Sequence, residues 1–221
     1  MSSPTELPGL ARLMEVCRRL NVEQKVALPG HTPLATGTLI EGLPLDPVLA
    51  AVYSRLGYAA FATDVAGFIL HRSDDEERQL EAKNQWWREG YRNQLALPTV
   101  IFAGEPFMAY HFATVPGLAD AQGYQPVVWV DVYAEPYAIP MASNVDSFFD
   151  VYSRYLEALL ATPGFKKGEV PLTFPWEVQG LHARDTRLVE LIREGRFDPL
   201  MPGMEERAWA LKVVSASDAR H

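Results

Sequence analysis

The stretch "YQPVVWVDVYAEPYAIPMASNVDSFFDVYSRYLEAL", Tyr124–Leu159, decides the fold, because it predicts two strands and a long helix in succession. Its first third is rich in β-branched and aromatic residues, which strands favour. A turn at Glu135 and Pro136 separates this strand from a shorter partner, "YAIPMA". Both faces of the first strand are largely apolar, so we expect it to be central in its sheet and covered by helices.

The last part of this stretch predicts an amphipathic helix with a defined start and end. Ser143 or Asn144 is placed to cap the helix, and Pro163 and Gly164 are typical of its end. Apolar side chains recur between them at the i, i+3, i+4 spacing that places them on one face. They are Val145, Phe148, Phe149, Tyr152, Tyr155, Leu156, Leu159 and Leu160. We therefore expect this helix to cover the sheet as scaffold.

The sequence before this stretch adds strands to the same sheet. "LPTVIFAG" and "FMAYHFAT" predict a hairpin whose turn lies at Gly104–Pro106. A further short strand is predicted within "FATDVAGFILHR". Helices are predicted for Pro8–Leu20, from Asp46 with Pro47 in the first turn, and from Asp74 or Asp75 onward.

Together these elements indicate an α+β fold. We expect a mostly antiparallel sheet of about four to six strands with helices packed on one face. Two short amphipathic helices are predicted after Pro163, so residues 163–221 are interpreted as a C-terminal helical extension. The 221 residues suit a single domain built from a core and this extension.

Composition places the chain among ordinary globular proteins. Hydrophobic residues make up 48% and charged residues 22%, which is enough for a packed core. No apolar run has the length that crosses a bilayer, and the first residues lack the form of a secretory signal. The single cysteine, Cys17, lies on an apolar helix face, where we expect it to pack as a small hydrophobe. These features favour a cytoplasmic protein.

The charge is acidic and unevenly distributed. The formal net charge is -8, and the segment from Asn93 to Ser153 contains no Lys or Arg. Nucleic-acid binding requires cations that neutralise phosphates, so this segment is a poor candidate for it. An acidic surface favours a basic protein partner and speeds its encounter. The alternative is a soluble acidic protein whose charge carries no information about partners.

Recognisable catalytic motifs are absent from the sequence. It contains no glycine-rich phosphate loop, no paired Cys or His spacing typical of zinc, and no nucleophile elbow. We therefore predict no catalytic, cofactor-binding or metal-binding residues. The best catalytic candidate is His111 with Asp131 or Glu135 beside it, although a structural histidine is the favoured interpretation. For Asp131, a position at an edge or capping a turn is favoured over a cleft.

One tryptophan of the pair Trp86 and Trp87 is a candidate contact residue. Adjacent helical residues point about 100° apart, so Trp87 shares a face with Leu80 and Tyr91 while Trp86 points away. A partly exposed Trp86 would be a plausible binding hot spot. The alternative, that both tryptophans seal an edge of the core, is the favoured one.

The order of elements resembles the SUKH superfamily, whose bacterial members are largely immunity proteins of polymorphic toxin systems. "GLPLDPVLAAVYSRLG" resembles the family's Leu-Pro and first helix, and "PTVIFAGEPFMAYHF" its strand pair. The opening stretch resembles its strand, charged turn and closing helix, in which Ser147 and Phe148 match the most specific part of the motif. The resemblance covers roughly residues 38–161.

The resemblance implies a non-enzymatic immunity protein that neutralises a cognate toxin by direct binding. Many such toxins are nucleases with basic surfaces, so an acidic immunity protein can compete with nucleic acid. The candidate contact residues are Asp74, Asp75, Trp86, Glu105, Asp120 and Glu135. The alternatives are a regulatory or scaffold protein of the same fold, and a small hydrolase-like enzyme that uses His111 and nearby acids. The sequence identifies neither the toxin nor the oligomeric state.

Overall fold

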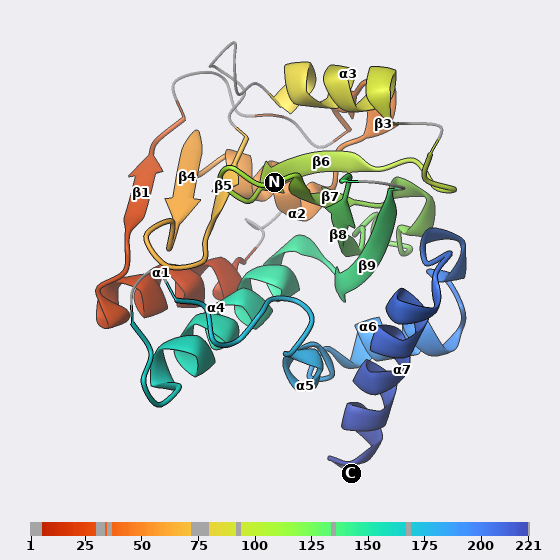
Figure 1. Cartoon of the computed structure of the whole chain (residues 1–221). Coiled ribbons are helices and arrows are strands. Elements are labelled where there is room, and N and C mark those ends of the chain that lie inside the picture. The colour runs from red at the N-terminus through yellow and green to blue at the C-terminus, as the bar shows by residue number, and fades with distance from the viewer. Residues whose placement is uncertain are drawn as a thin grey trace.

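A computed structural model describes residues 6–29, 34, 37–71, 80–91, 94–133, 136–166 and 169–220. In this part of the chain, seven strands form one sheet in the order β1-β4-β5-β6-β7-β8-β9 (Figure 1). Every neighbouring pair in the sheet is antiparallel. The predicted α+β fold is therefore confirmed. The sheet has seven strands, where about four to six were predicted.

The predicted hairpin and the two strands after it form one half of the sheet, with β8 between β7 and β9 as expected for a central strand. The sheet consists of β1 Gln24–Ala27, β4 Tyr58–Phe61, β5 Phe68–Leu70, β6 Val100–Gly104, β7 Tyr110–Thr114, β8 Val127–Asp131 and β9 Tyr137–Ala142. A separate ribbon pairs β2 Leu39–Ile40 with β3 Leu43–Pro44. The sequence analysis missed β1 and β4, which are short and include alanines with weak strand preference.

Helices α2 (Pro47–Tyr53) and α4 (Val145–Ala161) begin where their capping residues predict. The helix start predicted at Asp74 or Asp75 lies outside the described residues. Asn144 caps α4, because its Oδ1 accepts a hydrogen bond from the Ser147 N–H at 2.9 Å. Asp46 caps α2 in the same way, with 2.7 Å between its Oδ1 and the Leu49 nitrogen. The helices are α1 Pro8–Leu20, α2 Pro47–Tyr53, α3 Leu80–Gly90, α4 Val145–Ala161, α5 Gln179–His182, α6 Thr186–Arg193 and α7 Met204–Asp218. Within the described ranges, no helix has the length and apolar character needed to span a membrane.

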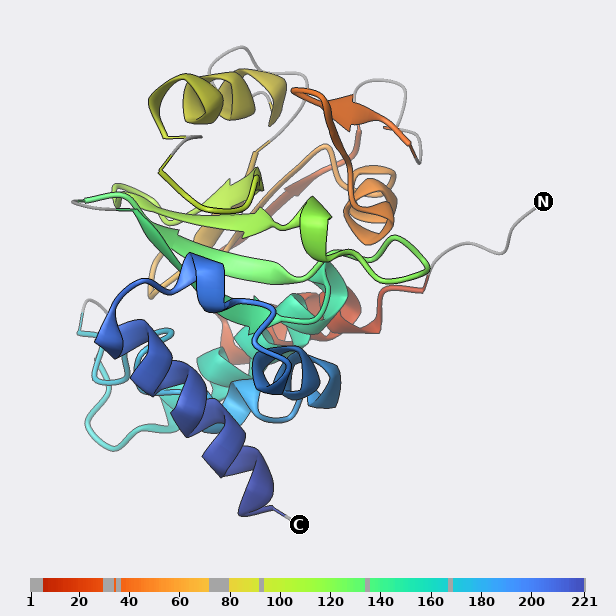
Figure 2. The ribbon, with the colours of Figure 1, turned by 90° about the vertical axis from the view of Figure 1, so that its right-hand side faces the viewer.

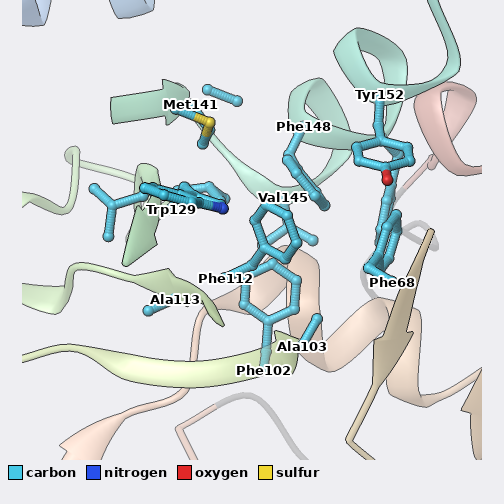
Figure 3. Packing of buried hydrophobic residues seen from close by; sticks show 14 of the residues in the cluster. Phe68, Phe102, Ala103, Phe112, Ala113, Trp129, Met141, Val145, Phe148 and Tyr152 are labelled. Atoms are coloured by element: carbon cyan, nitrogen blue, oxygen red, sulfur yellow. The ribbon is translucent and has the colours of Figure 1, made fainter. Parts of the chain in front are cut away.

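Helices α1 and α4 form the main layer beneath the sheet, while α3 lies over its opposite face (Figures 1 and 2). Helix α4 meets the sheet through Phe148, whose ring centre lies 4.8 Å from that of Phe112 and 5.3 Å from that of Phe68. Phe102 completes this group at 6.0 Å (Figure 3). The extension places α6 and α7 against β9, at one edge of the sheet.

Helix α3 is fixed to β6 by a side-chain amide. The register of β6 against β7 shifts between Ile101 and Ala103, and Asn84 of α3 bonds the backbone there. Its Oδ1 accepts from the Ile101 N–H at 2.8 Å, and its Nδ2 donates to the Ile101 carbonyl at 2.8 Å. Trp87 adds a bond from its Nε1 to Thr99 Oγ1 at 2.9 Å. These contacts set the position of Trp86 beside the sheet.

We predict that Asn84→Ala destabilises the protein by about 2–4 kcal/mol, because it leaves the buried Ile101 N–H and carbonyl without partners. The neighbouring change Gln85→Ala is the control, since Gln85 is exposed on the same helix and we expect a loss below about 0.5 kcal/mol. Urea unfolding followed by circular dichroism measures both. Equal effects of the two changes would show that the amide contact does not hold α3.

Candidate functional site at the β6–β7 hairpin

The turn that joins β6 to β7 carries an unusual phenylalanine. The Met108 N–H donates to the Glu105 carbonyl at 3.4 Å, which makes residues 105–108 a turn with Pro106 second and Phe107 third. Phe107 has a φ of 63°, at the position where a type II turn usually holds glycine. The strain costs about 1 kcal/mol or more. The Phe107 side chain is 103% exposed, so no packing within the described chain offsets that strain.

The hairpin borders a cleft on each face of the sheet. Gly104 pairs with His111 across the two strands, and both face α3. Because side chains alternate along a strand, the next residue, Glu105, points to the α4 side. Phe107 and Met108 at the tip line both clefts. We call them the Glu105 cleft and the His111 cleft.

The Glu105 cleft has a volume of about 400 Å³. Four segments line it. They are Thr63 with residues 65–67 after β4, the hairpin turn with Tyr110, the α4 tyrosines Tyr152 and Tyr155, and Val170, Thr173 and Phe174 of the connector. The hydroxyl of Tyr152 donates to the Ala66 carbonyl, and that of Tyr155 donates to the Leu172 carbonyl at 3.1 Å. These bonds hold segments from distant parts of the chain around one opening.

Glu105 places a poorly compensated carboxylate in this cleft. Its Oε1 accepts one hydrogen bond, from the indole Nε1 of Trp129 at 3.1 Å. Burial raises the pKa of Glu105 to about 7, and the bond from Trp129 acts in the opposite direction. Across the described ranges of the chain, no Lys, Arg or His forms an ion pair with it. Glu105 was predicted as a contact residue, but its burial was not.

We predict that Glu105→Gln stabilises the protein at alkaline pH. The folded-state pKa of about 7 exceeds the ordinary value of 4.5, so the folded protein holds this proton more tightly. The stability contributed by Glu105 is full below pH 4.5 and is lost as the pH rises through 7. The glutamine variant should exceed wild type by roughly 1–3 kcal/mol at about pH 8, and match it at about pH 4.

Urea unfolding at these two pH values measures this difference. Glu205→Gln is the matched control, because Glu205 is an exposed residue of α7 and its replacement changes the net charge equally. A glutamine variant at 105 that is no more stable than wild type near pH 8 would contradict the proposed desolvation.

The His111 cleft, of about 450 Å³, lies on the opposite face. Trp86 is 40% exposed at its rim while Trp87 is 4% exposed beneath it. The favoured interpretation, that both tryptophans seal an edge of the core, is therefore wrong for Trp86, and the alternative of a partly exposed Trp86 holds. Lys83 places its Nζ 4.0 Å from the centre of the Trp86 ring. The His111 ring centre lies 5.7 Å from that of Trp86. Burial, and to a smaller extent Lys83, lower the pKa of His111 to about 4, so it is neutral at pH 7.

The structure separates His111 from the acid proposed to assist it. His111 pairs with Val130, whereas Asp131 pairs with Tyr110 and therefore points to the opposite face of the sheet. The Asp131 carboxylate accepts from the Tyr133 N–H at 2.8 Å and from the Tyr137 hydroxyl at 3.2 Å. It caps a turn, as the favoured interpretation predicts. In the described part of the chain, no three His, Cys, Asp or Glu residues are grouped to hold a metal ion.

Of the other predicted contact residues, Asp120 alone lies within the described ranges, and it does not join this site. Asp74, Asp75 and Glu135 lie outside the described residues. Asp120 follows the far end of β7, where its Oδ1 accepts from the backbone N–H groups of Gln122 and Tyr124 at 2.8 and 2.9 Å. Among the described candidates, Trp86 and Glu105 lie at the hairpin, on opposite faces of the sheet. Asp120 shapes a loop elsewhere.

Sequence reasoning missed the residues that project most from the site. Phe107, Met108 and Tyr133 are 103%, 44% and 61% exposed. The segment "GEPFM" indicates a turn but not its strain, because proline at the second position suits type I turns, which need no positive φ, as well as type II turns. No local pattern indicated Tyr110 and Phe174 as walls of one cleft, since that requires the folded arrangement of β7 and the connector.

Comparison with protein-family models, curated proteins and solved structures finds no match to this chain. The SUKH resemblance stays a prediction from the motifs.

Proposed function

We propose that this protein acts by binding another protein at the β6–β7 end of its sheet, without chemistry of its own there. The observation that carries the proposal is Phe107, which combines complete exposure with a left-handed backbone. Strained, exposed residues concentrate at functional sites, and a buried aromatic anchor is typical of a binding hot spot. A partner that buries Phe107 supplies the packing that the described chain lacks.

The shape of the site favours a protein partner over a small molecule. Small-molecule sites enclose their ligand, whereas Phe107 and Met108 project outward between two open clefts. Exposed aromatic residues and methionine are enriched in protein interfaces, and Tyr133 and Trp86 extend the same surface on either side. We call the surface formed by Trp86, Phe107, Met108 and Tyr133 the docking surface.

The partner class that the SUKH resemblance implies is a cognate toxin, and the acidic charge favours one with a basic contact surface. Two observations support a basic partner: the segment 93–153, which contains the hairpin, has no Lys or Arg, and no described residue forms an ion pair with Glu105 beside the tip. Opposite charge on the partner speeds encounter and fixes the register of docking. The toxin identity itself rests on the motif resemblance.

We predict that Phe107→Ala weakens binding to the partner at least about tenfold, as removal of a hot-spot aromatic does. The probe is the protein encoded immediately upstream of this gene, titrated into the full chain by calorimetry. Leu211→Ala is the matched control, because Leu211 is an exposed apolar residue of α7, away from the hairpin, at 67% exposure. Both variants should keep wild-type stability, since neither side chain is packed.

If the upstream product binds and Phe107→Ala binds as tightly as Leu211→Ala, the docking surface is assigned wrongly. If the upstream product does not bind the wild-type chain at all, the immunity assignment fails.

We also predict that partner binding weakens as salt is added. Ions screen attraction between exposed charges over about 10 Å at 0.1 M, so a steered encounter slows mainly in its association rate. Association and dissociation rates measured by surface plasmon resonance from about 0.05 to 0.5 M sodium chloride test this. An association rate that does not change with salt would contradict the acidic-surface argument while leaving an apolar interface at Phe107 intact.

A further inference from the structure

Among the described residues, Glu105 has fewer hydrogen-bond and ion-pair partners than a carboxylate removed from water usually has. A buried carboxylate is normally paired with a cation or bonded by several donors. Glu105 is half-buried and accepts a single bond, from a neutral indole, through Oε1. The described ranges contribute no ion pair to it. The second carboxylate oxygen is thus available to a group that enters the cleft.

The walls of the cleft suit a cation. Tyr110 and Phe174 are half-buried rings that line it, and exposed Phe107 stands at its mouth. Behind Phe174 lie the buried rings of Tyr152 and Tyr155, with centres 5.0 and 5.1 Å from its own. Aromatic faces attract Lys and Arg side chains, more strongly where water is excluded. An anion would meet Glu105 and find no opposite charge from the described residues.

The composition of the cleft argues against a metal ion. A divalent cation with oxygen ligands needs several carboxylates or carbonyls, and Glu105 is the one carboxylate among the described residues that line the cleft. A side-chain cation needs one acid and apolar walls along its stem, which is what Glu105 and the rings supply.

We infer that the Glu105 cleft receives a Lys or Arg side chain of the docked protein partner, with Glu105 as its counter-ion and the surrounding rings as its walls. This inference rests on the proposed docking function, because Phe107 and Met108 belong both to the docking surface and to the cleft. It adds a specific recognition element: one cation of the partner, seated next to the partner's contact with Phe107.

The raised pKa of Glu105 gives this contact a pH dependence. The cation binds the ionised carboxylate, which predominates above about pH 7. Affinity for a cation should therefore fall about tenfold between about pH 8 and pH 6, as the ionised fraction falls. Bound cation should in turn lower the pKa of Glu105, because it stabilises the charged form.

The test uses the full chain and three blocked tripeptides, acetyl-Gly-Lys-Gly-amide, acetyl-Gly-Arg-Gly-amide and acetyl-Gly-Met-Gly-amide. Each is titrated to about 20 mM, since one such contact corresponds to millimolar affinity. The reporter is the Trp129 indole N–H resonance, because this group bonds Glu105. We expect the Lys and Arg peptides to shift it saturably at about pH 8 and about tenfold more weakly at pH 6, with no saturable shift from the Met peptide.

Two variants complete the design. Glu105→Gln should abolish the saturable shift, while Glu205→Gln, with the same change in net charge, should leave it unchanged. The inference is overturned if the Met peptide binds like the Lys peptide, or if neither cation moves the resonance. If Phe107→Ala still weakens partner binding in that case, the docking surface stands without the cation subsite. If the cation binds but Phe107→Ala has no effect on the partner, the docking proposal alone fails.

Discussion

The packing of Phe148 against Phe68, Phe102 and Phe112 is the contact on which the arrangement of this protein depends. It joins α4 to three neighbouring strands, and each such buried ring contributes about 1.5–3 kcal/mol. Helical residues four and seven positions apart share a face. The packing of Phe148 against the sheet therefore also places Tyr152 and Tyr155 on the side of α4 that faces the hairpin. The contact that holds the fold together therefore also builds the inner wall of the Glu105 cleft.

Alternation along β7 then divides the site into two faces. Phe112 packs into the α4 layer and His111 packs under α3 against Trp86 and Trp87. A shift of one residue in register would exchange these faces, and the buried ring of Phe112 strongly opposes such a shift. The same alternation points Asp131 away from His111, so these two residues do not form a catalytic pair.

The sequence was informative where a local pattern determines the outcome. Periodicity and caps identified α1, α2 and α4, and the 100° turn between adjacent residues separated Trp86 from Trp87. No sequence pattern indicated the contacts that depend on residues distant in the chain. Nothing near Asn84 indicates that its amide bonds Ile101, and the hydrogen bond that Glu105 accepts comes from Trp129, 24 positions away in the chain. Phe107 lies between these cases, because the sequence predicts a turn at Gly104–Pro106, one residue before it, but not its exposure.

The other acids differ from Glu105 in a way that supports the proposed partner. Asp46, Asp146 and Asp185 each accept two backbone N–H bonds that fix a helix end or join segments, so the fold itself explains them. Glu105 accepts one bond from a side chain and lies next to Phe107, whose backbone is strained and whose ring is unpacked. Both features lower the stability of the isolated chain, and both lie at the same end of the sheet. A basic protein that covers the hairpin would relieve both at once, since its cation would pair with the acid and its surface would bury the ring.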